Sequence, residues 1–233
     1  MSVYQHDADP TPELVAKAHR HVVDPGPRSG TVYLQDEDYA WWVDHILTGR
    51  GQSREFLVFA YGSLIWKPEF AAVEERIAHT YGWHRAFALK ITRWRGSPER
   101  PGLMLALDRG GACKGIAFRL PEEGLTKALG KLLRREMSAK PPSNVPRWIG
   151  LETAQGPVRA LAFVVDRNAP AYAGSLELGQ VADTLATAAG HWGSCAEYLY
   201  NTITHLEARG IRDRKLWQLQ ALVAERLQAE KRA

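Results

Sequence analysis

Six consecutive apolar residues, 56–61, followed at once by Gly62 and Ser63, restrict the fold of this chain more than any other feature. An unbroken apolar run of this length predicts a strand that is buried on both faces and ends in a tight turn. The run is far shorter than the roughly 20 residues that a membrane-spanning helix needs. We therefore expect a central strand inside a globular fold, and no transmembrane helix.

Further strand and helix patterns follow this run. Gly- and Pro-rich turns separate the apolar segments in the middle of the chain, and Gly110-Gly111 is expected to be a hairpin turn. The expected strands cover residues 86–92, 103–107, 113–120 and 158–165, and the expected helices cover residues 122–137, 181–189, 195–209 and 213–229. Strands in the middle of the chain and helices at both ends predict an α+β fold.

The first 53 residues are predicted to form a helical extension. Thr11 can cap a helix that starts at Pro12 and runs to about residue 21. A second helix is expected after Asp36, with one apolar face made by Tyr39, Trp42, Val43 and Ile46. We therefore expect an extension over residues 1–53 and a main domain over residues 54–233.

Composition excludes several classes of protein. The chain has 233 residues, 45% hydrophobic and 24% charged, which is typical of a globular protein and not of a disordered, collagen-like or coiled-coil one. Two cysteines are too few for a disulfide scaffold or a four-cysteine zinc site. The first residues lack the basic and apolar stretches of a signal peptide, so we expect a cytoplasmic protein. The net charge of +4 is a weak indication of nucleic-acid binding.

One expected helix carries a candidate for acid–base chemistry. Leu125, Ala128, Leu129 and Leu132 form an apolar stripe, and Glu136 continues it at about 20° of rotation from Leu125. A carboxylate on a buried face has a raised pKa, which suits proton transfer near neutral pH. The alternative is that the helix frays before Glu136 and that its carboxylate is solvated beside a neighbouring arginine.

The turn after the buried strand is a second candidate. Gly62 and Ser63 offer backbone N–H groups and a hydroxyl at the end of a strand, which suits a carboxylate or a developing oxyanion. The alternative is an ordinary turn between a strand and a loop. The Gly-x-Ser-x-Gly pattern of serine hydrolases is absent.

Three weaker candidates remain. The arginines and the tryptophan of residues 93–100 can bind phosphate or single-stranded nucleic acid, or they can form a solvated loop. His191 and Cys195 are four residues apart without further metal ligands, so packing roles are expected. Tyr172 can cover a pocket or fill the core.

Several segments, taken together and in order, resemble the ChaC-type gamma-glutamylcyclotransferases. The most specific are residues 59–68, FAYGSLIWKP, followed by residues 95–102, RGSPERPG. The others are Arg135-Glu136, Tyr172-Ala173-Gly174, and residues 188–190 ahead of residues 197–199. The resemblance covers residues 56–227, about three quarters of the chain.

The resemblance implies a small, mixed β-barrel-like sheet flanked by helices. It also implies a lyase of glutathione catabolism that cleaves glutathione to 5-oxoproline and Cys-Gly, with no metal and no other cofactor. Glu136 is the implied acid and base. The implied substrate-binding residues are Phe59, Ala60, Tyr61, Gly62, Ser63, Leu64 and Tyr172, with Arg95 steering the anionic substrate. Glutathione is the expected partner, without nucleic acid or membrane, and a monomer or weak dimer is expected.

That chemistry needs few protein groups, because the γ-glutamyl α-amine can itself close a five-membered ring on the γ-carbonyl. Two alternatives stay open: a cyclotransferase of other γ-glutamyl amines or amino acids, and a non-catalytic module that binds an anion or nucleic acid. The sequence departs from the family pattern after Glu136, where Met-Ser-Ala-Lys-Pro-Pro-Ser stands in place of glycines and a tyrosine.

Overall fold

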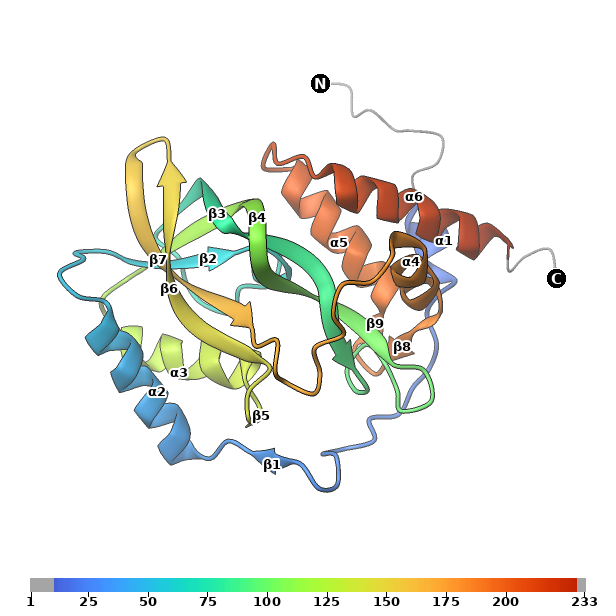
Figure 1. Cartoon of the computed structure of the whole chain (residues 1–233), viewed down its shortest axis with the longest axis horizontal. Helices are drawn as coiled ribbons and strands as arrows, with labels where there is room; N and C mark the ends of the chain where they lie inside the picture. The colour runs from blue at the N-terminus through green and yellow to red at the C-terminus, as the bar shows by residue number, and fades with distance from the viewer. Residues whose placement is uncertain (1–10, 230–233) are drawn as a thin grey trace. The chain divides into compact units, whose positions relative to one another are not determined.

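The computed structural model, which describes residues 11–229, contains a closed five-stranded barrel (Figure 1). The strand order is β2–β4–β3–β6–β7, made by β2 (Phe56–Ala60), β3 (Glu74–Ile91), β4 (Gly102–Leu120), β6 (Asn144–Thr153) and β7 (Gly156–Val165). Strand β2 pairs antiparallel with β4 and parallel with β7, while β6 is antiparallel to β3 and β7. The predicted α+β class with a mixed, barrel-like sheet is confirmed. Residues 1–10, in which no signal peptide is expected, lie outside the described residues.

The chain divides into two compact units. Within the described residues, unit 1 comprises residues 11–26, 87–104 and 173–229, and unit 2 comprises residues 27–86 and 105–172. Unit 1 holds α1 (Pro12–Ala16), α4 (Leu178–Thr187), β8 (Ala189–Gly190), β9 (Gly193–Ser194), α5 (Cys195–Glu207) and α6 (Arg214–Ala229). Unit 2 holds β1 (Val32–Tyr33), α2 (Asp36–Gly49), β2, the 3₁₀ turn η1 (Ser63–Ile65), α3 (Leu125–Glu136), β5 (Ala139–Lys140), β6 and β7. The boundary at residue 53 stays a prediction.

Within unit 1, helices α4, α5 and α6 pack on one another through their apolar faces (Figure 1). Gly210, with a φ of 70°, ends α5, and the N–H of Ile211 returns to the carbonyl of Leu206 at 2.9 Å. Helix α1 begins after Thr11 as expected but ends at Ala16 and not near residue 21. The N–H groups that follow bond three residues back, which tightens the last turn and ends the helix.

One expectation about the strands is wrong, and one strand was missed. Gly110-Gly111 is not a hairpin turn, because both glycines lie inside β4, with φ values of 101° and 66°. Glycine adopts such angles without strain, so the strand continues through them as one element. Strand β6 was not expected at all, because its side chains are half-exposed and Pro146 and Gly150 interrupt its pattern.

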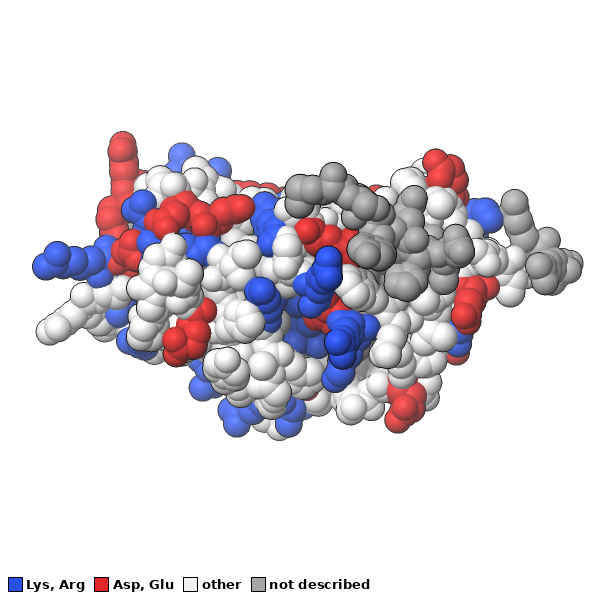
Figure 2. Space-filling model, turned by 90° about the horizontal axis from the view of Figure 1, so that it is seen from above, with Lys and Arg blue, Asp and Glu red and all other residues white. Residues whose placement is uncertain are grey.

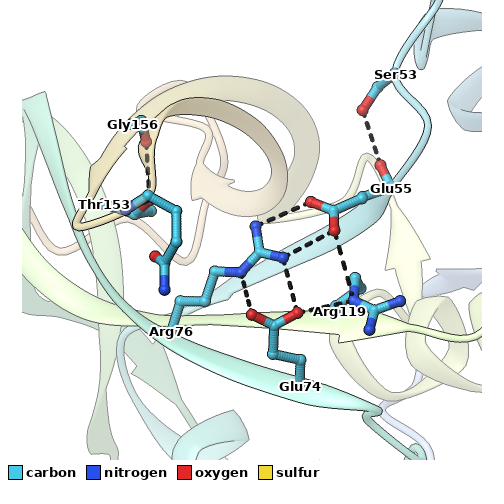
Figure 3. Close-up of polar contacts among 8 residues, drawn as sticks. Ser53, Glu55, Glu74, Arg76, Arg119, Thr153 and Gly156 are labelled. Atoms are coloured by element: carbon cyan, nitrogen blue, oxygen red, sulfur yellow. Dashed lines mark hydrogen bonds and ion pairs between the residues drawn. The ribbon is translucent and has the colours of Figure 1, made fainter.

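Charged side chains of both signs are interspersed over the face shown in Figure 2. One cluster ties together the entry of β2 and the strands β3 and β4 (Figure 3). Arg76 donates to Glu74 at 2.6 Å and to Glu55 at 2.8 Å, and Arg119 donates to Glu74 at 3.0 Å. Hydrogen bonds from Arg76 and Arg119 lower the pKa of Glu74 to about 2.

Candidate active site

Strand β2 delivers residues 61–65 to the end of the barrel in a fixed conformation. Phe59 and Ala60 are fully buried, as expected for a strand covered on both faces. The hydroxyl of Tyr61 donates to the carbonyl of Phe163 on β7 at 2.8 Å. The carbonyl of Tyr61 accepts from Nε of Arg85 on β3 at 3.0 Å. The turn is therefore held by contacts with two other strands of the barrel, β7 and β3.

The backbone that follows presents donors at the start of η1. The carbonyl of Gly62 accepts from the N–H of Ile65 at 2.9 Å, which closes the 3₁₀ turn. Among the hydrogen bonds of residues 11–229, none uses the N–H of Gly62, Ser63 or Leu64. The first N–H groups of a helical turn have no partner inside it. The sequence indicated Gly62 and Ser63 for a carboxylate or an oxyanion, and the family resemblance added Leu64.

Glu136 is the last residue of α3 and continues its buried stripe. Leu125, Leu129, Leu132 and Leu133 are buried, and the side chain of Glu136 is only 15% exposed. Burial raises the pKa of the Glu136 carboxyl above its ordinary value, and the adjacent Arg135 guanidinium opposes that rise. The helix therefore does not fray before Glu136, and its carboxylate is not a solvated surface group.

Arg135 joins the carboxylate to the turn after β2. Its Nε donates to Oε1 of Glu136 at 3.1 Å, and its Nη2 donates to Oγ of Ser63 at 3.0 Å. Its Nη1 donates to the carbonyl of Lys67 and lies 3.4 Å from the carboxylate of Glu69. One guanidinium thus places Glu136 beside Ser63. The sequence named Arg135 within the family pattern and as a neighbour of Glu136, but gave it no role.

Tyr172 belongs to a separate group in unit 2. Its hydroxyl donates to Oδ2 of Asp108 at 2.8 Å, and Arg167 donates to Oδ1 of the same carboxylate at 2.7 Å. Burial raises the pKa of Tyr172, and its bond to the Asp108 carboxylate adds to that rise. In the described part of the chain, no hydrogen bond joins Tyr172 to Glu136 or to residues 59–64. Asp108 was not singled out from the sequence.

Arg95 lies in unit 1, where its guanidinium is committed to internal partners. Its Nη1 donates to Oε2 of Glu197 at 2.6 Å and to the carbonyl of Ser194 at 2.8 Å. Only 8% of the residue is exposed. Cys195, expected to be a packed residue, is fully buried, and burial raises the pKa of its thiol to about 11. The steering role of Arg95 stays a prediction.

The surface hollows of unit 2 lie away from Glu136, and the described residues show neither a metal cluster nor a membrane-spanning helix. Two surface hollows share Pro157, Val158 and Arg159 in their lining, and neither is lined by Glu136 or by residues 59–64. Within residues 11–229, no three His, Cys, Asp or Glu side chains gather closely enough to hold a metal ion. No helix in the same described range is long and apolar enough to cross a membrane.

The fold and this geometry define a class: a five-stranded barrel with a buried carboxylate beside backbone donors, suited to acid–base catalysis. A family model described as "ChaC-like protein" matches residues 56–226. The chain therefore belongs to the ChaC-like family.

Named relatives agree with the family. The chain is 38% identical over 157 residues to the glutathione-specific gamma-glutamylcyclotransferase of Escherichia coli K12, covering 67% of each chain. It is 31% identical over 169 residues to the glutathione-specific gamma-glutamylcyclotransferase 1 of Mus musculus, covering 70% of this chain and 74% of the relative. A crystal structure of a yeast gamma-glutamylcyclotransferase specific to glutathione superposes with a TM-score of 0.67 at 18% identity, covering 74% of this chain and 97% of that chain. This last likeness supports the fold.

Proposed function

We propose that this chain is a gamma-glutamylcyclotransferase that cleaves glutathione to 5-oxoproline and Cys-Gly. The observation that carries the proposal is the buried carboxylate of Glu136, joined through Arg135 to Ser63. All three residues lie inside the family match, as do Gly62 and Leu64. The names of the relatives supply the substrate.

The substrate supplies its own nucleophile. The α-amine of the γ-glutamyl group attacks the γ-carbonyl carbon, a five-membered ring closes, and the C–N bond to the cysteine breaks. The amine is mostly protonated near neutral pH, so a base must first remove a proton. The departing cysteine nitrogen must later gain a proton. Because the ammonium loses two protons and the departing amine gains two, the reaction is balanced without an external acid or base.

Glu136 relays protons between the two nitrogens. Its ionised carboxylate accepts a proton from the ammonium, and the carboxylic acid so formed gives a proton to the departing nitrogen. Its raised pKa suits both steps, because a group that titrates closer to neutral pH can both accept and donate. The N–H groups of Gly62, Ser63 and Leu64 would hold the tetrahedral oxyanion or the γ-glutamyl carboxylate.

The test is the release of 5-oxoproline from glutathione by the purified protein, with γ-glutamyl-alanine as the competing substrate. We expect the wild type to release 5-oxoproline and Cys-Gly from glutathione in preference to the other substrate. Glu136→Gln should lower the rate by about 10²–10⁴-fold, because positioned acid–base groups contribute that much. The circular dichroism spectrum of this variant should equal that of the wild type, because glutamine has nearly the same shape as glutamate.

Glu123→Gln provides the matched control. Glu123 is an exposed residue in the turn before α3, so this variant loses the same charge and should keep full activity. Full activity in Glu136→Gln would exclude the carboxylate as the catalytic group. If the wild type cleaves only γ-glutamyl-alanine, the reaction class stands and glutathione is the wrong substrate. No 5-oxoproline from either substrate would contradict the proposed function.

The proposed substrate also predicts the compartment in which the protein acts. Glutathione is the thiol that keeps the cytosol reducing, so a glutathione-cleaving enzyme has its substrate in the cytoplasm. Cell fractionation should find the protein there.

A further inference from the structure

The residue that follows Glu136 is fixed by a helix far away in the sequence. Met137 is buried, and its carbonyl accepts from the hydroxyl of Tyr39 on α2 at 2.8 Å. The last carbonyls of a helix have no donors within the helix and need partners from elsewhere. Tyr39 therefore supplies the donor at the point where α3 ends and its last side chain is Glu136.

Contacts from residues 31–50 flank Glu136 on both sides along the chain. Before it, the guanidinium of Arg134 lies 4.2 Å from the ring centroid of Tyr39 and donates to Asp36 at 2.7 Å. After it, strand β1 pairs with β5, with Val32 opposite Lys140 and Tyr33 opposite Ala139. The N–H of Leu34 donates to the carbonyl of Ser138 at 2.9 Å, and Lys140 pairs with Asp38 at 2.6 Å.

The same segment is anchored at its other end. Val43 and Ile46 are buried, and Nε1 of Trp148 on β6 donates to the carbonyl of Ile46 at 3.3 Å. Arg50, directly after α2, donates to both carboxylate oxygens of Glu122, whose carbonyl accepts from the first N–H of α3. Residues 31–50 thus contact both ends of α3 and rest on the barrel.

These residues lie outside the segment that the family model matches, which begins at residue 56. They reach the segment after Glu136 in which the sequence departs from the family pattern. We propose that residues 31–50, which we call the N-terminal brace, position Glu136 for proton transfer, with Tyr39 as the positioning residue. This inference rests on the proposed function. A group that transfers protons must be held within about 0.5 Å of its productive place, and a frayed last turn cannot do so.

Tyr39→Phe tests the brace, because it removes only the hydroxyl and keeps the ring against Arg134. We expect kcat for 5-oxoproline release to fall about tenfold while KM changes less than about twofold, because misplacement of a catalytic group affects the chemical step. The Michaelis complex should form as before. A residue that acted only on overall stability would change neither value well below the unfolding temperature.

The pH profile separates positioning from stability. Arg135 from α3 and Glu69 from the loop after η1 are the charged groups that face Glu136, and neither is altered by the substitution. A looser helix end admits water to the carboxylate and relieves the burial that raises its pKa. The acidic limb of kcat, below which Glu136 is protonated and cannot act as a base, should therefore move to lower pH in Tyr39→Phe.

Tyr33→Phe is the matched control within the brace. Its hydroxyl accepts a hydrogen bond from the N–H of Arg28 at 2.7 Å, away from α3. We expect the activity, the KM and the pH profile of this variant to equal those of the wild type. Equal effects in both variants would mean that the brace acts through overall stability, and would overturn the inference.

Hydrogen exchange gives a readout that needs no catalysis. The N–H of Met137 bonds to the carbonyl of Leu133 at 2.8 Å, so its exchange reports the last turn of α3. We expect exchange there to become about tenfold faster in Tyr39→Phe and to stay unchanged in Tyr33→Phe. Unchanged exchange in Tyr39→Phe would overturn the brace. An inactive wild type would overturn the proposed function while the exchange result still decided whether Tyr39 holds the helix end.

Discussion

At the scale of single residues, two opposing effects act on Glu136. Burial raises the pKa of its carboxyl, and the guanidinium of Arg135, at 3.1 Å, stabilises the ionised form. Burial is the larger effect, so the net shift is upward. A raised pKa brings the carboxyl closer to neutral pH, which suits a group that both accepts and donates a proton.

Replacing Arg135 by an uncharged residue should raise the pKa of Glu136 further. Arg135→Gln removes the cation that stabilises the ionised Glu136, so the pKa of Glu136 should rise further. Activity that requires the ionised form then appears only at higher pH, and the acidic limb of kcat should shift upward. At neutral pH we expect a loss of about 10–100-fold, because the link to Ser63 is also lost. The pH dependence of 5-oxoproline release measures both effects.

Arg135→Lys separates charge from geometry. Lysine keeps the positive charge but cannot bond Glu136, Ser63 and the Lys67 carbonyl together, as the arginine does. We expect a reduced kcat with the acidic limb close to its wild-type position. An unmoved limb in Arg135→Gln would show that the guanidinium does not act on the carboxylate.

Sequence periodicity offered a buried Glu136 as one of two alternatives, the family resemblance favoured it, and neither indicated its partners. The apolar stripe of α3 placed the carboxylate on a buried face, and the structure has it there. Arg135 reaches Ser63 across 72 positions, and Tyr39 reaches Met137 across 98. Helical periodicity relates residues within one element and carries no information about which element lies opposite. The hydrogen bond between Tyr172 and Asp108 could not be predicted for the same reason.

At the scale of elements, the strands and helices whose hydrophobic pattern follows from burial alone were predicted well. Strand β2 is buried on both faces, so its apolar run is unbroken, and the C-terminal helices carry clear stripes. The sequence predicts two strands in place of β4, because glycine pairs usually mark turns, and here the strand continues through them. Strand β6 lies opposite β7 along its whole length but has mixed exposure, so pairing and not hydrophobicity defines it.

Gly115 lies on β4, where this strand approaches β2 closely. Strand β2 is the one that leads into the candidate turn. A Cβ at Gly115 would lie 2.8 Å from the ring of Phe59 and closer still to the carbonyl oxygen of Ala60. We expect Gly115→Ala to lower the free energy of unfolding by about 1–3 kcal/mol, the usual effect of overpacking a core. Urea unfolding measures this value.

Gly150→Ala is the matched control on β6. No atom lies within 4 Å of a Cβ at Gly150, so the same substitution should change the free energy of unfolding by less than about 0.5 kcal/mol. Equal losses in the two variants would mean that close approach is not what requires glycine at position 115.

At the scale of the whole molecule, most of the charge is balanced locally. The net charge is only +4, and acidic and basic side chains are interspersed over the visible face (Figure 2). Within unit 1, Arg93 donates to both oxygens of Asp24 at 2.7 and 2.6 Å, and Arg95 pairs with Glu197. Cations committed to carboxylates are poor phosphate ligands, because an incoming phosphate must displace the acid. Arg93 and Arg95 are therefore poorly placed to bind any anion without displacing these carboxylates.

Acid should weaken the fold through the cluster of Figure 3. The pKa of Glu74 is lowered to about 2, below its ordinary value, because Arg76 and Arg119 donate to its carboxylate. A group whose pKa is lower in the folded state stabilises the protein above its ordinary pKa, and that contribution is lost as pH falls toward the folded-state value. Arg76→Gln removes the main donor. We therefore expect this variant to be less stable than the wild type at pH 7, with the difference shrinking between about pH 4.5 and pH 2.

Urea unfolding at pH 7 and at pH 3 measures this change, with Arg226→Gln as the control. Arg226 pairs with Asp183 at 2.7 Å and with Glu225 at 3.7 Å, and both carboxylate side chains are 66% exposed. Exposed pairs contribute about 0–1 kcal/mol, so this control should lose little stability at either pH. If Arg76→Gln lost as much stability at pH 3 as at pH 7, the ionised carboxylates of Glu55 and Glu74 would not be the source of the stabilisation. Packing of the arginine side chain along β3 would then account for it, since that contribution does not depend on pH.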